Sequence, residues 1–146
     1  MANNYILIVE DNPDDLEMTR RALKKANVGH PVVAVHDGAQ ALDFLLERGD
    51  YENREPHGNP TVVLLDLKLP KVDGLEVLKT IRATPQLHLI PVVTLTSSDE
   101  EKDMIRSYDL GANSYVKKPV TFQEFAESVG TLGLYWSLVN RPPPDI

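Results

Sequence analysis

Five short segments, the first four mainly apolar, alternate along the chain with longer stretches that have helical spacing of apolar residues. The segments are residues 5–9, 32–35, 62–65, 90–95 and 113–116. Runs of this length without polar alternation are typical of strands buried on both faces of a parallel sheet. Strands separated by helices require right-handed crossovers, which place helices on both faces. The pattern therefore predicts an α/β fold, a flavodoxin-like (βα)5 doubly wound parallel sheet with strand order 2-1-3-4-5.

Helix-capping residues support the same division of the chain. Asn12 and Pro13 predict the start of the first helix, with Asn as N-cap and Pro at the first helical position. Asp73 and Glu76 have capping-box spacing for a helix that reaches about residue 82. Ser98 with Glu101 and Thr121 with Glu124 repeat that spacing before the last two helices, and another helix is expected over about residues 39–48. The residues expected to face inward are Leu16, Thr19, Leu23, Ala26, Ala41, Leu42, Leu45, Leu46, Leu75, Leu78 and Ile81.

Composition narrows the class of protein. With 146 residues, 42% of them apolar and 25% charged, the chain suits one packed domain. The net charge of −7 argues against binding to a nucleic-acid backbone, and the absence of cysteine excludes disulfides and thiolate metal sites. No run resembles a secretory signal or is long enough to span a membrane, so we expect a cytoplasmic protein. The four histidines, His30, His36, His57 and His88, lack metal-site spacing and are expected at the surface.

Two segments are expected to lie outside the regular elements. Residues 49–60 are polar, contain Gly and Pro, and are long for a helix-to-strand connection. They could form a partner-contacting loop or a tolerated insertion, and composition slightly favours the insertion. Residues 142–144 are all proline and cannot continue a helix. We therefore expect one domain over residues 1–140 and a Pro-rich exposed tail over residues 141–146.

Polar residues follow the predicted strands at the points where the strands end. Asp66 ends the run 62–65, while Glu10 and Asp11 follow the run 5–9. Thr96 follows the fourth strand, and Lys118 follows the fifth. Carboxyl ends of parallel strands meet at one edge of the sheet, where sites are built in this fold class. In the predicted order the first and third strands are neighbours about 5 Å apart, so the three acids should form one patch.

Three carboxylates in one patch repel each other unless a cation lies among them. Lys118 is one candidate cation, and a hard divalent ion such as Mg²⁺, which prefers oxygen ligands, is another. A metal, an ammonium and a hydroxyl together suit a phosphoryl group. No Ser or Cys nucleophile is suitably placed, so a carboxylate is the candidate nucleophile, and Asp66 is favoured because it ends the central strand.

Four motifs in order, VEDN, LLDLKLPKVDG, VTLTSS and YVKKP, resemble a response-regulator receiver domain over about residues 5–138. The resemblance implies that Asp66 is the phosphoacceptor for a histidine kinase. It implies that Glu10, Asp11, Asp66 and the backbone carbonyl of Lys68 bind Mg²⁺, with Mn²⁺ as an alternative metal. It further implies that Thr96 and Tyr115 form a switch pair, that Lys118 contacts the phosphate, and that Lys118 and Pro119 are joined by a cis peptide bond.

Three positions vary within this pattern. Glu10 stands where many members have Asp, which leaves open whether its metal contact is direct or through water. Ser97 stands where a small Ala is common and would slightly crowd the phosphoryl site. Lys68, two residues after the acceptor, places a positive side chain beside the route of an attacking water. The sequence therefore leaves the lifetime of the phosphorylated state open.

A narrower resemblance concerns residues 49–60, SYDLGANSYVKKPV and GLYWSLVNRPPP, which are similar to stand-alone regulators paired with bacterial and cyanobacterial phytochromes. It implies a homodimer and a sensor histidine kinase partner, for which a phytochrome is the candidate. Independently, Leu134, Tyr135 and Leu138 place a second apolar face on the last helix, and Phe122 lies near the same end. We expect these four residues to form the dimer face.

We therefore expect a phosphorylation-dependent signalling switch that catalyses only its own phosphorylation and dephosphorylation. One alternative is a Mg²⁺-dependent aspartyl-phosphate phosphohydrolase. Such enzymes usually carry a second Asp two residues after the nucleophile, where this chain has Lys68. Another is a receiver-like interaction module that is never phosphorylated, which the full acidic set disfavours. A nucleotide-binding α/β protein is weaker still, because neither glycine-rich phosphate motif occurs.

Overall fold

The computed structural model describes residues 5–25, 29–69, 71–96, 101–117 and 127. Along the chain it contains β1 (Ile6–Val9), α1 (Pro13–Lys25), β2 (Val32–Val35), α2 (Gly38–Leu45), the 3₁₀ turn η1 (Gly49–Tyr51), β3 (Val62–Leu65), α3 (Gly74–Ala83), β4 (Val92–Thr96), α4 (Glu101–Asp109) and β5 (Ser114–Lys117). All strand pairs are parallel, and the order is β2-β1-β3-β4-β5. The predicted fold class and strand order are confirmed.

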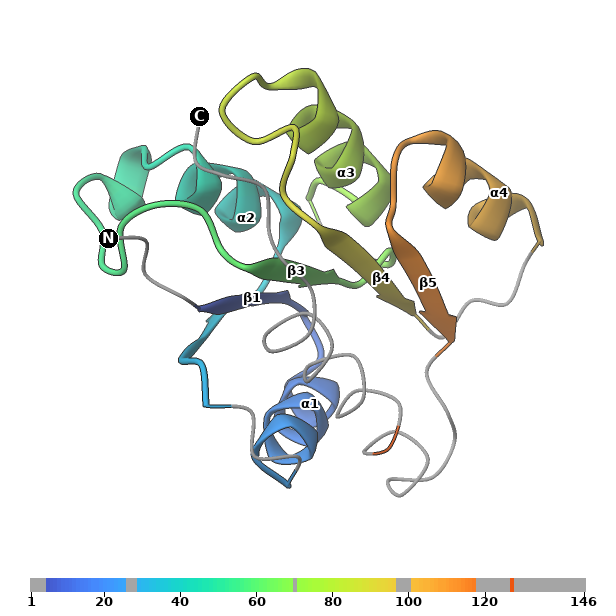
Figure 1. Cartoon of the computed structure of the whole chain (residues 1–146), viewed down its shortest axis with the longest axis horizontal. Helices are drawn as coiled ribbons and strands as arrows, with labels where there is room; N and C mark the ends of the chain where they lie inside the picture. The colour runs from blue at the N-terminus through green and yellow to red at the C-terminus, as the bar shows by residue number, and fades with distance from the viewer. Residues whose placement is uncertain (1–4, 26–28, 70, 97–100, 118–126, 128–146) are drawn as a thin grey trace.

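The sheet separates two layers of helices (Figure 1). Helix α1 covers one face, while α2, α3 and α4 lie on the other. Strand side chains alternate between the faces, so β1 sends Leu7 and Val9 into one core cluster and Ile6 and Ile8 into the other. Each fully buried aliphatic side chain of this kind stabilises the fold by about 1.5–3 kcal/mol. Packing in the two clusters fixes the position of each strand end, and therefore the position of the residues that follow it.

The helices begin at the predicted caps. The Asn12 Oδ1 accepts from the N–H groups of Asp14 at 2.9 Å and Asp15 at 3.1 Å. The Asp73 Oδ1 accepts from the Glu76 N–H at 3.1 Å. Each bond satisfies a donor that the first helical turn leaves without an intrahelical partner. Ser98, Ala26 and the Thr121–Glu124 pair lie outside the described residues.

Several sequence expectations were wrong in detail. Helix α2 ends at Leu45 rather than residue 48, and Phe44, not expected in the core, is fully buried. In α3 the inward positions are Val77, Leu78 and Ile81, while Leu75 is only partly buried. Val77 is buried in place of Leu75, because the first turn of α3 faces the loop before it rather than the sheet. His30, expected at the surface, is partly buried in the connection before β2.

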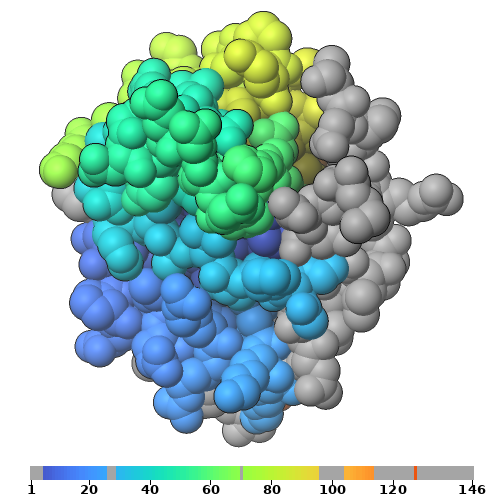
Figure 2. All heavy atoms as spheres, turned by 90° about the vertical axis from the view of Figure 1, so that its left-hand side faces the viewer, coloured from blue at the N-terminus to red at the C-terminus, as the bar shows by residue number. Residues whose placement is uncertain are grey.

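Residues 49–60 are packed against the domain rather than loosely inserted. Arg54 is only 7% exposed, and its Nε donates to the Phe44 carbonyl at 2.7 Å. The Tyr5 hydroxyl donates to the Gly58 carbonyl at 2.7 Å, and the Asn59 amide donates to the Gln86 carbonyl at 2.9 Å. Figure 2 shows this green segment against teal α2 and close to the yellow segment before β4. The segment therefore covers the amino end of the sheet, opposite the edge that carries the acids.

None of the helices in the described part of the chain is both long enough and apolar enough to cross a bilayer.

Candidate functional site

Three carboxylates converge at the carboxyl edge of the sheet. One carboxylate oxygen from each of Glu10, Asp11 and Asp66 lies within 4.8 Å of the other two. The convergence follows from strand register, because Val9 pairs with Leu65 and the next residues are Glu10 and Asp66. The sheet ladder continues one residue further, with the Asp66 N–H donating to the Val9 carbonyl at 3.1 Å. Backbone pairing therefore brings the predicted acids together.

The three acids differ in their surroundings. Glu10 is 3% exposed and Asp66 is 6% exposed, whereas Asp11 is open to solvent. The Glu10 Oε2 accepts from the Asn12 N–H at 3.3 Å, and the Asp66 Oδ1 accepts from the Lys68 N–H at 3.1 Å. These backbone donors orient the two buried carboxylates. The site therefore combines two fixed, buried acids with one accessible acid.

The loop between β3 and α3 follows the central acid and is tightly held. The Gly74 N–H donates to the Leu67 carbonyl at 3.0 Å, which closes the loop on itself. Leu69 and Val72 pack against the core cluster on the α2 and α3 side. A Cβ on Gly74 would overlap the Asp66 carbonyl and lie 2.5 Å from the Leu67 Cα. The start of α3 therefore approaches the backbone beside Asp66 as closely as glycine allows.

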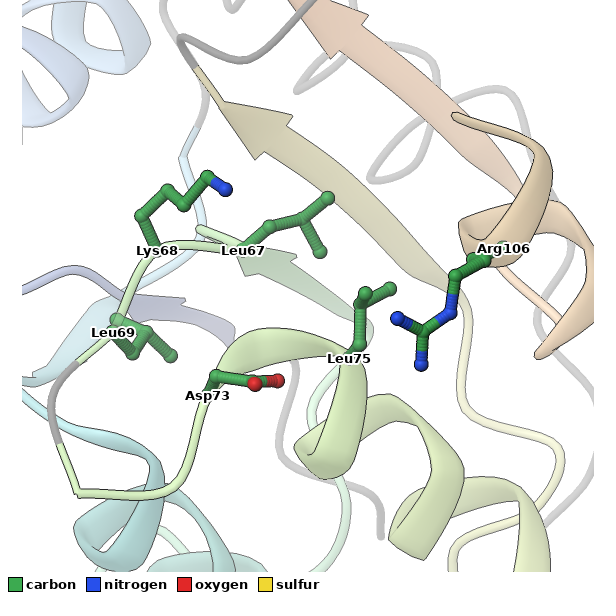
Figure 3. Close-up of a pocket in the computed structure, with 6 residues that line it drawn as sticks. All are labelled: Leu67, Lys68, Leu69, Asp73, Leu75 and Arg106. Atoms are coloured by element: carbon green, nitrogen blue, oxygen red, sulfur yellow. The ribbon is translucent and has the colours of Figure 1, made fainter. Parts of the chain in front are cut away.

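A shallow pocket of about 390 Å³ adjoins this loop. Figure 3 shows its lining residues, which are Leu67, Lys68, Leu69, Asp73, Leu75 and Arg106. Arg106 extends from α4 toward Leu75, so the pocket lies between the loop, the first turn of α3, and α4. Sequence reasoning missed it because Arg106 and Leu75 belong to different helices and share no spacing along the chain.

Other predicted site residues are placed by the sheet. Thr96 is the last residue of β4, and Tyr115 lies in β5 opposite Thr94. Thr96 pairs with Lys117, so the chain leaves β5 at the same edge as the acids. Lys118, Pro119 and the expected dimer-face residues Phe122, Leu134, Tyr135 and Leu138 lie outside the described residues. Within the described part, Thr96 thus joins the three acids at one edge.

The acidic cluster is chemically suited to a hard divalent cation. All three donors are carboxylate oxygens, the ligand type that Mg²⁺ and Mn²⁺ prefer in proteins. Two of the acids are buried, and a cation among them would offset their mutual repulsion. The donor set therefore fits the metal implied by the sequence.

The sequence profile of the response regulator receiver domain matches residues 6–130, and the chain belongs to that family. Response regulator Rcp1 of Synechocystis sp. is 40% identical over 131 residues, covering 90% of this chain and 87% of Rcp1. A Mn²⁺-bound structure of Rcp1 has a TM-score of 0.88 at 38% identity, covering 96% of this chain and 99% of the Rcp1 chain.

Two further solved structures resemble the chain along nearly its whole length. The bacteriophytochrome response regulator AtBRR is 54% identical, with a TM-score of 0.76, covering 97% of this chain and 99% of AtBRR. The phosphorylated cyanobacterial phytochrome response regulator RcpA is 38% identical, with a TM-score of 0.89, covering 99% of this chain and 100% of RcpA. The predicted family and the predicted similarity to phytochrome-associated regulators are therefore confirmed.

Proposed function

We propose that this receiver domain accepts a phosphoryl group on Asp66 from a histidine kinase in a Mg²⁺-dependent reaction. The observation that carries the proposal is the convergence of Glu10, Asp11 and Asp66, with oxygens within 4.8 Å, at the carboxyl edge of the sheet. Asp66 is the acceptor in this proposal because it ends the central strand and the Lys68 N–H holds its carboxylate in place.

In the transfer, an Asp66 carboxylate oxygen forms a bond to phosphorus while the phosphorus–nitrogen bond of the kinase phosphohistidine breaks. Mg²⁺, bound by the three acids and the Lys68 carbonyl, would neutralise phosphoryl oxygens as charge builds on them. The chain itself supplies orientation of the nucleophile through the Lys68 N–H. Thr96 and Lys118 complete the proposed site as a hydroxyl donor and an ammonium.

The proposed output is a change in self-association or partner docking. Phosphorylation adds negative charge and acceptor oxygens at the edge where β4 ends. Thr96 and Tyr115, in the neighbouring strands β4 and β5, form the proposed switch pair. Helix α4 lies beside β5 and exposes Met104, Ile105 and Tyr108, which offers an apolar contact surface. The proposed dimer face adds Phe122, Leu134, Tyr135 and Leu138.

The proposed partner is a sensor histidine kinase of the phytochrome type. Support comes from relatives that are 53% and 54% identical and are both bacteriophytochrome response regulators. Such signalling would take place in the cytoplasm. A purified phytochrome kinase labelled on its histidine should pass the phosphoryl group to this chain faster than a kinase from an unrelated pathway does. Equal rates from both kinases would remove the phytochrome assignment and leave the acceptor role intact.

Acetyl phosphate tests the acceptor directly. Incubation with Mg²⁺ should add one phosphoryl group, seen by intact mass as an acid-stable and base-labile adduct. The adduct should be absent in Asp66→Asn and after removal of Mg²⁺ by a chelator, and unchanged in Asp43→Asn, a matched variant on α2. An adduct that persists in Asp66→Asn would refute the assignment of Asp66. Rapid turnover of unrelated phosphate esters would instead identify a phosphohydrolase.

A further inference from the structure

The carbonyl and N–H of Lys68 belong to the loop between β3 and α3, so the path of that loop sets the geometry of the proposed metal site. The turn between β2 and α2, Asp37 and Gly38, lies against the loop. Its contacts point to a role at the site, an inference that rests on the metal-dependent function proposed above.

Asp37 is a buried acid with two partners. It is 6% exposed and caps α2 by accepting from the Gln40 N–H at 2.7 Å. The Gln40 side chain in turn accepts from the His36 N–H at 2.8 Å, which locks the turn. The other Asp37 oxygen lies 3.6 Å from the Lys71 ammonium, in the loop after the acceptor. A helix cap needs only the first of these contacts, so the ion pair requires a separate explanation.

Gly38 and the loop backbone are in direct contact. A Cβ on Gly38 would overlap the Val72 carbonyl and lie 2.8 Å from the Val72 Cβ. Lys71 has a φ of +66°, a left-handed conformation that is unfavourable for a non-glycine residue. Val72 and Leu69 also pack onto the core. The loop is therefore held in a strained path by contacts on both sides of Lys71.

We propose that the Asp37–Gly38 turn is a positioning element for the metal site, acting through Lys71 and Val72 on the backbone at Lys68. Mg²⁺ demands near-ideal octahedral geometry, so a small shift of one carbonyl ligand weakens binding. The turn contacts the loop at Lys71 and Val72, which follow Lys68 along the chain. Its effect is to fix the loop from which the Lys68 carbonyl and the N–H donor to Asp66 both project.

Binding of Mn²⁺ to the full chain, followed by the electron paramagnetic resonance signal of free Mn²⁺, tests the proposal. Asp37→Asn keeps a good N-cap and removes the charge, while Lys71→Met removes the other partner. Each should weaken Mn²⁺ binding by about threefold, the size of a modest ion-pair contribution. The double variant should be no weaker than either single variant, since both remove the same contact. Gly38→Ala should displace Val72 and weaken binding by about tenfold.

The two charge variants separate positioning from simple electrostatics. If charge alone mattered, loss of the Asp37 carboxylate would weaken cation binding and loss of the Lys71 ammonium would strengthen it. Positioning predicts weaker binding in both. Ile81→Val in α3 is the control for lost stability, and it should lower the urea concentration at the unfolding midpoint without changing Mn²⁺ affinity.

A second measurement uses acetyl phosphate. At saturating Mg²⁺ the rate of Asp66 phosphorylation in Asp37→Asn should approach that of the unaltered chain, while the Mg²⁺ concentration for half-maximal rate rises about threefold. Unchanged Mn²⁺ affinity in both Asp37→Asn and Lys71→Met, or stronger binding in Lys71→Met, would overturn the inference. If the unaltered chain bound no Mn²⁺, the proposed function itself would fail, which is a different result.

Discussion

At the scale of single residues, the amino end of the sheet is organised around a buried cation. The Arg54 guanidinium lies 4.0 Å from the centre of the Phe44 ring and donates to the carbonyls of Phe44, Pro56 and Gly58. Tyr51 and Tyr5 meet the same ring edge-on, with centroid distances of 5.4 and 6.1 Å. The planar fork of arginine satisfies three carbonyls at once, which the single ammonium of lysine does not reproduce.

Arg54→Lys should therefore destabilise the domain by about 2–4 kcal/mol, because buried carbonyls lose their donors and the ring loses its stacked partner. Urea unfolding measures the change. The control is Arg48→Lys, whose exposed pair with Asp43 at 2.8 Å should contribute less than about 1 kcal/mol. If the two variants lost the same free energy of unfolding, Arg54 would stabilise the domain no more than an exposed ion pair does, and the prediction would be wrong.

Tyr5 gives a pH-dependent prediction. Burial raises the pKa of Tyr5 from 10.0 to about 12, with the nearby Arg54 cation acting in the opposite direction. The folded state binds the phenol proton more tightly than the unfolded state does. The resulting stability, roughly 3 kcal/mol, is present below pH 10 and is lost as the pH rises to about 12.

The free energy of unfolding of the unaltered chain should accordingly fall between pH 10 and 12. This fall adds to any pH dependence that other titratable groups contribute. Tyr5→Phe should lose about 1 kcal/mol at pH 7, the hydrogen bond to Gly58, and should show a smaller fall in that alkaline range. Urea unfolding at several pH values measures both effects. An alkaline fall of the same size in Tyr5→Phe would assign it to other groups.

At the scale of elements, the start of α3 sets the distance between that helix and Asp66, the proposed acceptor. Gly74→Ala should push α3 away from the Asp66 carbonyl, since no space exists for a Cβ. We expect destabilisation of about 1–3 kcal/mol, typical of overpacking, together with slower phosphorylation by acetyl phosphate. Lys79→Ala on the exposed face of the same helix is the control. A Gly74→Ala chain with unaltered stability and rate would contradict this prediction.

The sequence was sufficient for the elements whose signal is local. Apolar runs identified the strands, and Asn12 and Asp73 marked helix starts, because both signals arise within a few residues. The convergence of Glu10, Asp11 and Asp66 was also predictable, since strand order alone places those positions at one edge. The family resemblance then supplied the proposed roles that geometry alone does not.

Contacts between distant segments were not predictable in the same way. The burial of Arg54 depends on Phe44 and Tyr5, which come from α2 and the start of β1. Asp37 caps α2 and also pairs with Lys71, which lies 34 positions further along the chain. Leu75 satisfied helical spacing but faces a pocket rather than the core. In each case the outcome is decided by a neighbour far along the chain, which composition and periodicity do not encode.

At the scale of the whole molecule, one side chain of α3 ties together the segments that precede β4 and β5. Arg82 donates to the carbonyls of His88, Ile90 and Gly111 and to the Asn113 side chain, at 2.7–2.9 Å. Asn113 also accepts from the Val92 N–H at 2.8 Å. Burial lowers the pKa of the Arg82 guanidinium below its ordinary value. This region is therefore anchored at the edge opposite the acids, so a change caused by phosphorylation would be largest near the acids.

The α4 surface is the part of the proposed output that the described residues allow to be tested. Ile105 and Tyr108 are 58% and 51% exposed. Tyr108 lies about one helical turn after Met104 and Ile105 in α4. If phosphorylation promotes self-association through this face, Ile105→Glu should weaken the dimer at least tenfold, because a charge would be desolvated in an apolar contact. Leu89→Glu is the matched control, since Leu89 is 45% exposed but precedes β4.

Light scattering before and after acetyl phosphate measures the dimer, and a monomer in both states at micromolar concentration would refute self-association. A dimer weakened equally by Leu89→Glu would place the contact elsewhere on the surface.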